Sequence, residues 1–162
     1  MINTQPQLVM LCGIPTSGKS SYVCQGLDET DCFDGYVVLS TDAYIECKAV
    51  ENNVSYNEAY NELFEAAQKR LDYDLERAIR ENKSIVWDQT NLTPKVRKRK
   101  LSRIPAHYRK VVVWFDISLE EAMIRNQQRP GKVIPGSVLK RMFHTFSPPT
   151  EVEDFDQIIK GN

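Results

Sequence analysis

The chain has 162 residues, a formal net charge of −1 at pH 7 and an apolar content of 41%. This length suffices for one domain with a hydrophobic core, and the composition excludes fibrous and intrinsically disordered chains. A net charge near zero gives no global attraction to nucleic acid, so any polyanion site has to be a local patch. We therefore expect a single domain over residues 1–162.

The sequence also bears on the compartment. No apolar stretch is long enough to cross a membrane, and the polar segment 1–7 lacks the charged start of a signal peptide. None of the four cysteines forms a C-x-x-C pair and the two histidines stand alone, which argues against a zinc site or a disulfide framework. Cys12 is expected to be a buried strand residue. We expect a reduced, cytoplasmic protein without membrane contact.

Apolar strands alternate with helical segments, which predicts an α/β fold with a mainly parallel β-sheet flanked by helices. Capping boxes at Ser55 with Glu58 and at Ser118 with Glu121, and a cap at Thr93 before Pro94, mark three helix starts. The expected strands cover residues 8–12, 36–40, 84–88, 110–115 and 155–159. The expected helices cover residues 19–27, 43–49, 55–81, 118–128 and 137–146, with a further one starting at 94.

The most specific motif lies between the first strand and the first helix. Residues 13–20 read Gly-Ile-Pro-Thr-Ser-Gly-Lys-Ser, the complete phosphate-binding pattern G-x-x-x-x-G-K-[ST]. The preceding strand argues against the alternative of a chance Gly-Lys-Ser turn. Its glycines let backbone N–H groups surround phosphate oxygens at a helix N-terminus. The residues expected to bind a nucleoside triphosphate such as ATP are Gly13, Ile14, Pro15, Thr16, Ser17, Gly18, Lys19, Ser20 and Ser21.

Two positions in this loop have expected roles in chemistry. Lys19 is placed to reach the β- and γ-phosphates, and the Ser20 hydroxyl to hold Mg²⁺.

Two carboxylates follow strands, at the edge where open parallel sheets bind ligands. Asp42 follows the strand 36–40, which we expect beside the strand 8–12, and Asp88 ends the strand 84–88. Phosphoryl transfer needs a group that accepts the acceptor's proton, and Asp42 is the candidate general base. Capping a helix that starts at Ala43 is an alternative, compatible role. Asp88 is expected to orient metal-bound water or the acceptor, or else to make a buried hydrogen bond to its loop.

Arg125 and Arg129 lie four residues apart on one face at the end of a helix, ahead of Pro130 and Gly131. This arrangement predicts a helical lid over about residues 125–137 that closes over ATP, with Arg129 as the main phosphate contact. The alternative is that both cations only complement the helix dipole.

Two further patterns have both a functional and a structural interpretation. The segment 95–110 is rich in lysine and arginine, includes Arg97 and has no acidic residue, which fits a nucleic-acid contact or a solvated helix face. Tyr56, Tyr60 and Phe64 recur at helical spacing within 55–81, which favours the core over a base-stacking surface.

Together these motifs resemble the kinase domain of the bacteriophage polynucleotide kinase family, within the P-loop kinases. The segments that carry the resemblance are the loop 13–20, Leu-Ser-Thr-Asp-Ala-Tyr at 39–44, Asp-Gln-Thr-Asn-Leu-Thr-Pro at 88–94 and the lid sequence 125–135. The resemblance implies a P-loop kinase fold. It also implies transfer of the ATP γ-phosphate to a polynucleotide 5′-hydroxyl, of RNA or DNA, in nucleic-acid repair.

The resemblance also implies residue roles. Asp42 would be the general base, Lys19 and Ser20 the ATP and Mg²⁺ contacts, Arg129 the lid arginine on the transferring phosphate and Arg125 an auxiliary lid residue. The residues expected at the acceptor are Asp42, Asp88, Thr90, Asn91 and Arg97.

Three features depart from the family pattern. Ile45 stands where the family has an arginine that contacts substrate phosphate, and the nearest cation is Lys48. Asp88 stands one place earlier than its family counterpart. Asp116 is followed by Ile-Ser, so the D-x-D-x-T phosphatase motif is missing and a free-standing kinase is expected. Two alternatives stay open: a P-loop kinase for another hydroxyl, such as a small metabolite or a modified DNA base, and a non-catalytic module that binds NTP and RNA.

Overall fold

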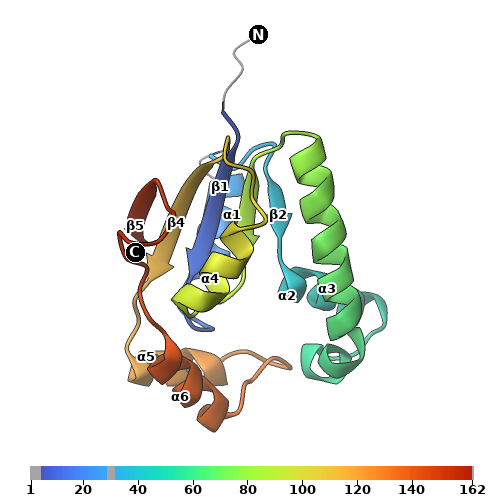
Figure 1. Ribbon diagram of the computed structural model, residues 1–162. Helices are drawn as coiled ribbons and strands as arrows, with labels where there is room; N and C mark the ends of the chain where they lie inside the picture. The colour runs from blue at the N-terminus through green and yellow to red at the C-terminus, as the bar shows by residue number, and fades with distance from the viewer. Residues whose placement is uncertain (1–4, 29–31, 162) are drawn as a thin grey trace.

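A five-stranded parallel sheet forms the centre of the computed structural model, which describes residues 5–28 and 32–161. The strand order is β2-β3-β1-β4-β5 (Figure 1). The strands are β1 (Gln7–Cys12), β2 (Val37–Leu39), β3 (Ile85–Asp88), β4 (Arg109–Phe115) and β5 (Gln157–Gly161). All four strand pairs are parallel, which confirms the predicted α/β fold.

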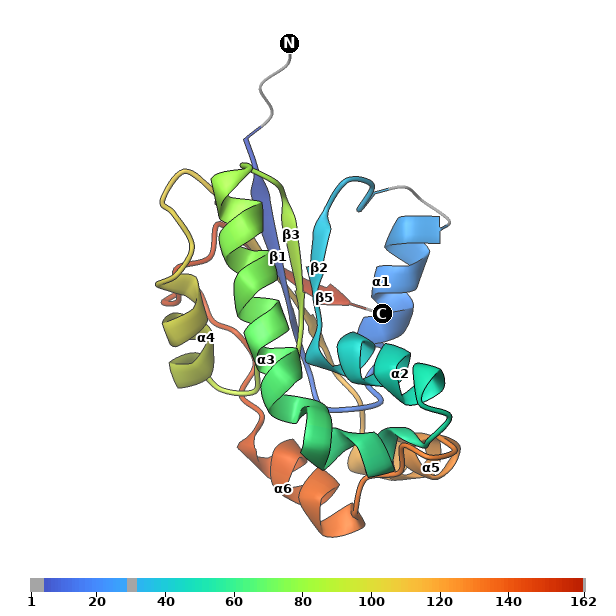
Figure 2. The same ribbon diagram turned by 90° about the vertical axis from the view of Figure 1, so that its right-hand side faces the viewer.

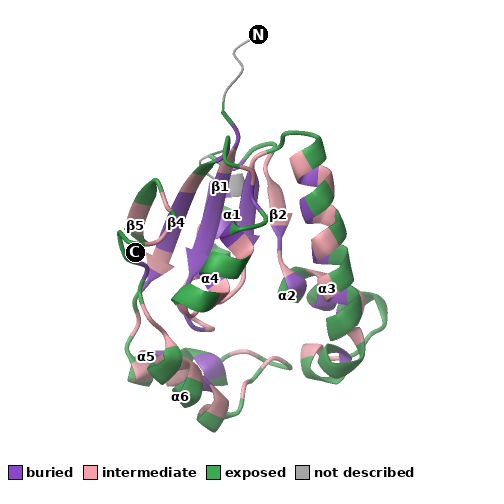
Figure 3. Cartoon of the chain, viewed as in Figure 1, coloured by how far each residue is buried: buried purple, intermediate pink, exposed green. Residues whose placement is uncertain are grey.

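Helices cover both faces of the sheet (Figures 1 and 2). One face packs against α1 (Lys19–Asp28), and the other against α3 (Tyr56–Arg80) and α4 (Pro94–Leu101). Both faces need cover because apolar side chains of β1 alternate between them. Val9 and Leu11 point to the face that packs against α1, and Leu8, Met10 and Cys12 to the face that packs against α3 and α4. Figure 3 shows β1 almost entirely buried, with only Gln7 partly exposed, whereas the helices that pack on the sheet have exposed outer sides. Cys12 is fully buried, as predicted.

Three helices lie near the carboxyl ends of the strands: α2 (Thr41–Glu51), α5 (Leu119–Gln127) and α6 (Gly136–Thr145) (Figure 1). The predicted capping box of Ser55 and Glu58 forms with both hydrogen bonds, and Thr93 accepts a backbone N–H three residues on. At Ser118 only half of the predicted box forms, because the Ser118 side chain accepts the Glu121 N–H while the Glu121 carboxylate pairs with Arg125. No helix in the described part of the chain is long and apolar enough to span a membrane.

Two expectations about strands are corrected. The last strand begins at Gln157 rather than at residue 155, because Phe155 packs into the core before the ladder with β4 starts. Strand β2 does not lie beside β1, because β3 pairs with both and separates them. The three-residue β2, with Val37 and Val38 only half-buried, suits the sheet edge.

Candidate active site

The phosphate-binding loop joins β1 to α1 and has no room for side chains at its first glycine. A Cβ on Gly13 would lie 2.6 Å from Ser17 Oγ and 3.2 Å from the Phe115 carbonyl oxygen. Gly18 has a φ of +105°, in the region that favours glycine. The Ser17 hydroxyl is buried and has no hydrogen-bond partner in the described residues. The loop therefore has an unused hydroxyl donor, in addition to its backbone N–H groups, for an anion bound there.

Lys19 folds back into this loop. Its amine is buried and donates hydrogen bonds to the carbonyl oxygens of Gly13, at 2.9 Å, and Ile14, at 2.8 Å. Burial lowers the pKa of Lys19 to about 8, while the nearby charges of Asp88 and Asp42 favour the protonated form. Lys19 and both predicted carboxylates therefore lie close enough together to influence one another's charge.

Asp88 ends β3 directly beside the loop, in register with Leu11 of β1. Burial raises its pKa, and Lys19 opposes this shift. Within the described part of the chain its carboxylate makes no hydrogen bond, so the alternative of a structural bond to its own loop is not observed. An acidic group in this position is available to a ligand or a hydrated metal ion.

Asp42 lies in the first turn of α2 with its side chain 55% exposed. Ser40, not Asp42, caps the helix by accepting the Ala43 N–H. Asp42 Oδ1 accepts a 2.7 Å hydrogen bond from the Tyr56 hydroxyl, and Oδ2 lies 3.5 Å from Lys132 Nζ. Burial and the Asp42 carboxylate hold the pKa of Tyr56 well above its usual range, so the hydroxyl remains a donor.

Sequence reasoning missed Tyr56 and Lys132 as site residues. Lys132 also pairs with Glu46, and its Nζ lies 4.4 Å from the centre of the Tyr56 ring. The motif around Asp42 gave no sign of either partner. The sequence signals were the position of Lys132 in the predicted lid and of Tyr56 in the first turn of the helix that follows α2.

The segment between α5 and α6, which we predicted as a lid, docks on the start of α3. The Asn57 backbone N–H donates to the Gly131 carbonyl at 2.9 Å, and its side-chain amide to the Val133 carbonyl at 3.0 Å. The amide of Asn126 makes two hydrogen bonds with the backbone of Ile134. These contacts fix the segment against the helix whose Tyr56 holds Asp42.

The two lid arginines differ in their contacts. Arg125 pairs with Glu121 at 2.7 Å and donates to the Thr16 carbonyl at 3.2 Å, on the rim of the phosphate-binding loop. Arg129 has a buried guanidinium nitrogen, Nη1, without a partner in the described residues. Arg129 therefore has a spare donor for a phosphate oxygen, whereas Arg125 is already bonded.

The expectation that Arg97 contacts an acceptor is wrong. Its side chain is fully buried, and it forms two 2.7 Å bonds to Glu153. It also donates 2.9 Å bonds to the carbonyls of Asn91 and Ser147. Because Glu153 and Ser147 are distant in the sequence, helix periodicity could not reveal this clamp.

Asn91 is structural for a similar reason. It is 1% exposed, its amide nitrogen donates to the Leu11 carbonyl at 2.7 Å, and its amide oxygen accepts from Lys100. The neighbouring Thr90 carbonyl accepts the Gly13 N–H at 2.9 Å. The Thr90 backbone and the Asn91 side chain thus support the phosphate-binding loop, and the Asn91 side chain has no free group for an acceptor. An acceptor contact by the Thr90 side chain stays a prediction.

The predicted basic surface is smaller than the run of charges suggests. Arg103 pairs with Asp72 at 2.7 Å, Lys110 with Asp154, and Arg97 with Glu153. Burial lowers the pKa of Lys100 to about 7. The carboxylates missing from the segment itself come from other elements, and Lys95, Lys98, Arg99 and Arg109 remain as exposed cations without a carboxylate partner in the described residues.

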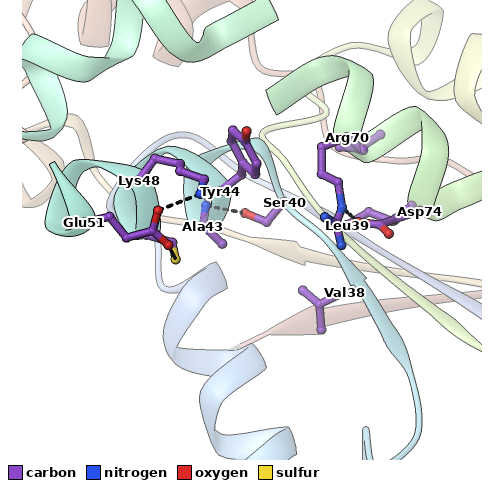
Figure 4. Close-up of a pocket in the computed structure, with 11 residues that line it drawn as sticks. Val38, Leu39, Ser40, Ala43, Tyr44, Lys48, Glu51, Arg70 and Asp74 are labelled. Carbon is purple, nitrogen blue, oxygen red and sulfur yellow. Dashed lines mark hydrogen bonds and ion pairs between the residues drawn. The ribbon is translucent and has the colours of Figure 1, made fainter. Parts of the chain in front are cut away.

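Neither Ile45 nor Lys48 supplies a cation beside Asp42. Ile45 is fully buried in the α2–α3 core. Lys48 lines a pocket of about 330 Å³ between α2, α3 and the end of β2 (Figure 4). There it pairs with Glu51 at 2.6 Å, and Arg70 pairs with Asp74 at 2.7 Å. Lys48 follows Asp42 by six residues, about 9 Å along the axis and on another helix face, so it does not replace the missing arginine.

Fold and loop together define a P-loop nucleotide-binding protein with a kinase-like fold. The chain belongs to the AAA domain family, whose profile matches residues 8–149.

Solved structures share the fold. A gluconokinase from Sinorhizobium meliloti is 19% identical, with 98% of this chain and 83% of that chain covered and a TM-score of 0.55. Chaetomium thermophilum Kti12 in complex with ADP-AlF3 is 15% identical, with 95% and 88% covered and a TM-score of 0.64. A chain of the Pnkp1/Rnl/Hen1 complex is 19% identical, with 77% and 41% covered and a TM-score of 0.57. The likeness to that last chain spans less than half of its length.

Proposed function

We propose that this protein transfers the γ-phosphate of ATP to a polynucleotide 5′-hydroxyl, with Asp42 as the general base. The observation that carries the proposal is that three charged side chains lie at the carboxyl end of the sheet: Lys19 folded into the loop, Asp88 at the end of β3 beside β1, and Asp42 in the first turn of α2. A protein that only binds nucleotide has no use for a half-exposed carboxylate that a tyrosine and a lysine hold in place.

In this proposal the loop and the lid bind the triphosphate. Backbone N–H groups of residues 13–18 surround the phosphates, Lys19 exchanges its bonds to loop carbonyls for bonds to phosphate oxygens, and Arg129 uses its spare nitrogen. Asp42 accepts the proton of the acceptor hydroxyl as that oxygen bonds to the γ-phosphorus and the bond to the ADP oxygen breaks.

The residues present also fit Mg²⁺, which supplies positive charge beside the β- and γ-phosphates when bound. The described residues contain no cluster of three or more Asp, Glu, His or Cys side chains that could hold a metal. Mg²⁺ commonly binds through one or two protein ligands together with substrate phosphates. Ser20 and Asp88 are the residues that would hold it, Asp88 through water.

The acceptor assignment rests on the resemblance to polynucleotide kinases, supported by the fold shared with a chain of the Pnkp1/Rnl/Hen1 complex. A small-molecule hydroxyl is the second candidate. It is favoured by the burial of Ile45, in place of a phosphate-binding arginine, and by the fold shared with a gluconokinase.

The test is radiolabel transfer from γ-labelled ATP with Mg²⁺ to 5′-hydroxyl RNA and DNA oligonucleotides. Asp42→Asn should keep ATP affinity and lose turnover about 100- to 10,000-fold, as expected for a general base. Glu51→Gln, on the same helix but facing the pocket in Figure 4, is the matched control and should leave turnover unchanged.

Other outcomes separate the alternatives. Near-normal turnover of the Asp42→Asn protein would remove the base assignment. Transfer of the label to a small hydroxyl compound, with none to the oligonucleotides, would favour the second candidate. Bound ATP without transfer to any hydroxyl would indicate a non-catalytic module.

A further inference from the structure

Helix α3 is longer than the sheet that it covers. Its later residues Leu71, Leu75 and Ala78 pack against β1 and β3 in the main core. Its first turns extend past the carboxyl ends of the strands (Figures 1 and 2). There α2 replaces the sheet and buries Ala59 and Ala67, but Tyr60 stays 38% and Phe64 41% exposed. The prediction that these two side chains lie in the core is therefore wrong, because α2 covers only part of the stripe beyond the end of the sheet.

These exposed rings continue a row that starts at the candidate base. The rings of Tyr56 and Tyr60 have centroids 5.7 Å apart, and those of Tyr60 and Phe64 5.4 Å apart. We call Tyr56, Tyr60 and Phe64 the aromatic row. Tyr56 donates to Asp42 at one end of the row, and burial, with a smaller effect of the Asp42 charge, raises the pKa of Tyr60. The row thus leads away from the point where an acceptor hydroxyl would react.

The charge around the row does not suit a phosphate. Lys132, over the Tyr56 ring, is paired with Asp42 and Glu46. Ile45 is buried between α2 and α3 and adds no charge. A ligand held here has to be bound through its uncharged faces, and an aromatic surface binds a flat, unsaturated ring best.

We propose that the aromatic row is the acceptor-binding wall, on which the base at the 5′ end stacks against Tyr60 and Phe64 while its 5′-hydroxyl reaches Asp42. This inference rests on the proposed phosphotransfer to polynucleotide ends. Stacking of one base on an aromatic side chain corresponds to about a 5- to 150-fold change in affinity. Recognition of the acceptor then depends on its terminal base more than on its phosphates.

The experiment compares two 5′-hydroxyl oligonucleotides that differ only in the terminal residue, which carries a base in one and is abasic in the other. In the wild-type protein the abasic acceptor should have a KM about 5- to 150-fold higher, with a much smaller change in kcat. Tyr60→Leu and Phe64→Leu should raise the KM of the base-containing acceptor and reduce the difference between the two. Tyr73→Leu, at a residue 57% exposed farther along α3, is the control and should change neither.

Equal KM values for the two acceptors in the wild-type protein would overturn the proposal, as would full discrimination in the leucine variants. Fluorescence anisotropy with the same oligonucleotides measures affinity without phosphate transfer. Base-dependent binding without transfer would support the aromatic row as a binding wall and refute the proposed phosphotransfer. Equal affinities for the two oligonucleotides would refute the role of the aromatic row, whether or not transfer occurs.

Discussion

Arg97→Met should destabilise the protein by about 3–5 kcal/mol, the usual cost of removing one partner of a buried ion pair. The Arg97 side chain is 0% exposed and that of Glu153 is 9% exposed. The substitution deprives Glu153 of two 2.7 Å hydrogen bonds and the carbonyls of Asn91 and Ser147 of one each. Methionine refills much of the volume, so the loss of polar partners dominates. Glu153 keeps the Thr150 N–H at 3.1 Å, which favours the lower half of the range.

Urea unfolding followed by far-UV circular dichroism measures this loss. Arg99→Met, an exposed neighbour on α4, should change the free energy of unfolding by less than about 0.5 kcal/mol. The double variant Arg97→Met with Glu153→Leu should be more stable than Arg97→Met alone, because it leaves no unpaired carboxylate. A loss below about 1 kcal/mol, with a selective loss of oligonucleotide affinity, would refute this reasoning and return Arg97 to the acceptor site.

The same variant has a functional consequence through its neighbours. Arg97 holds the Asn91 carbonyl, Asn91 holds the end of β1 at Leu11, and Thr90 accepts the N–H of Gly13. Loosening this chain of hydrogen bonds should weaken ATP binding, although Arg97 does not face the loop's anion site.

Three further predictions concern single positions. Gly13→Ala should abolish ATP binding by isothermal calorimetry and cost about 1–3 kcal/mol of stability, because its Cβ would lie 2.6 Å from Ser17 Oγ; normal ATP affinity would contradict this geometry. Lys100 has a pKa of about 7 in the fold and of about 10.4 in the unfolded chain. Between these two pH values the unfolded chain binds more protons than the folded one, so the free energy of unfolding should rise with pH by up to about 1.4 kcal/mol per pH unit. Urea unfolding from pH 6.5 to 9 should show this rise reduced in Lys100→Met and retained in Lys98→Met; equal slopes would contradict it. Asp88→Asn should raise the Mg²⁺ concentration needed for half-maximal phosphate transfer several-fold, and an unchanged Mg²⁺ dependence would exclude Asp88 from the metal site.

Features that depend on neighbouring residues could be predicted from the sequence. The capping box of Ser55 and Glu58 is local, because both hydrogen bonds join groups within four residues. The phosphate-binding loop is local in the same sense, since its glycines and Lys19 fold on one another's backbone. The alternation of strands and helices indicated the α/β class for the same reason.

Features that depend on residues distant in the sequence could not be predicted in this way. Charge pattern along α4 showed Arg97 without a carboxylate nearby, and its partner Glu153 is 56 residues away. Hydrophobic periodicity identified the stripe on α3. It could not show that beyond the sheet α2 buries Ala59 and Ala67 but leaves Tyr60 and Phe64 exposed. Strand periodicity identifies strands and not their neighbours, so it could not place β3 between β1 and β2.

The corrected strand order supports Asp42, rather than Asp88, as the general base. Neighbouring parallel strands lie about 4.8 Å apart, so the end of β2 is about 10 Å from the end of β1 and its phosphate-binding loop. Asp88, on the strand between them, lies close to Lys19 and would suit holding a metal ion through water. A base has to lie beyond the γ-phosphate, on the side from which the acceptor oxygen attacks in line with the leaving oxygen. In the proposed reaction, Asp42, one strand farther out and anchored by Tyr56 and Lys132, would be that base.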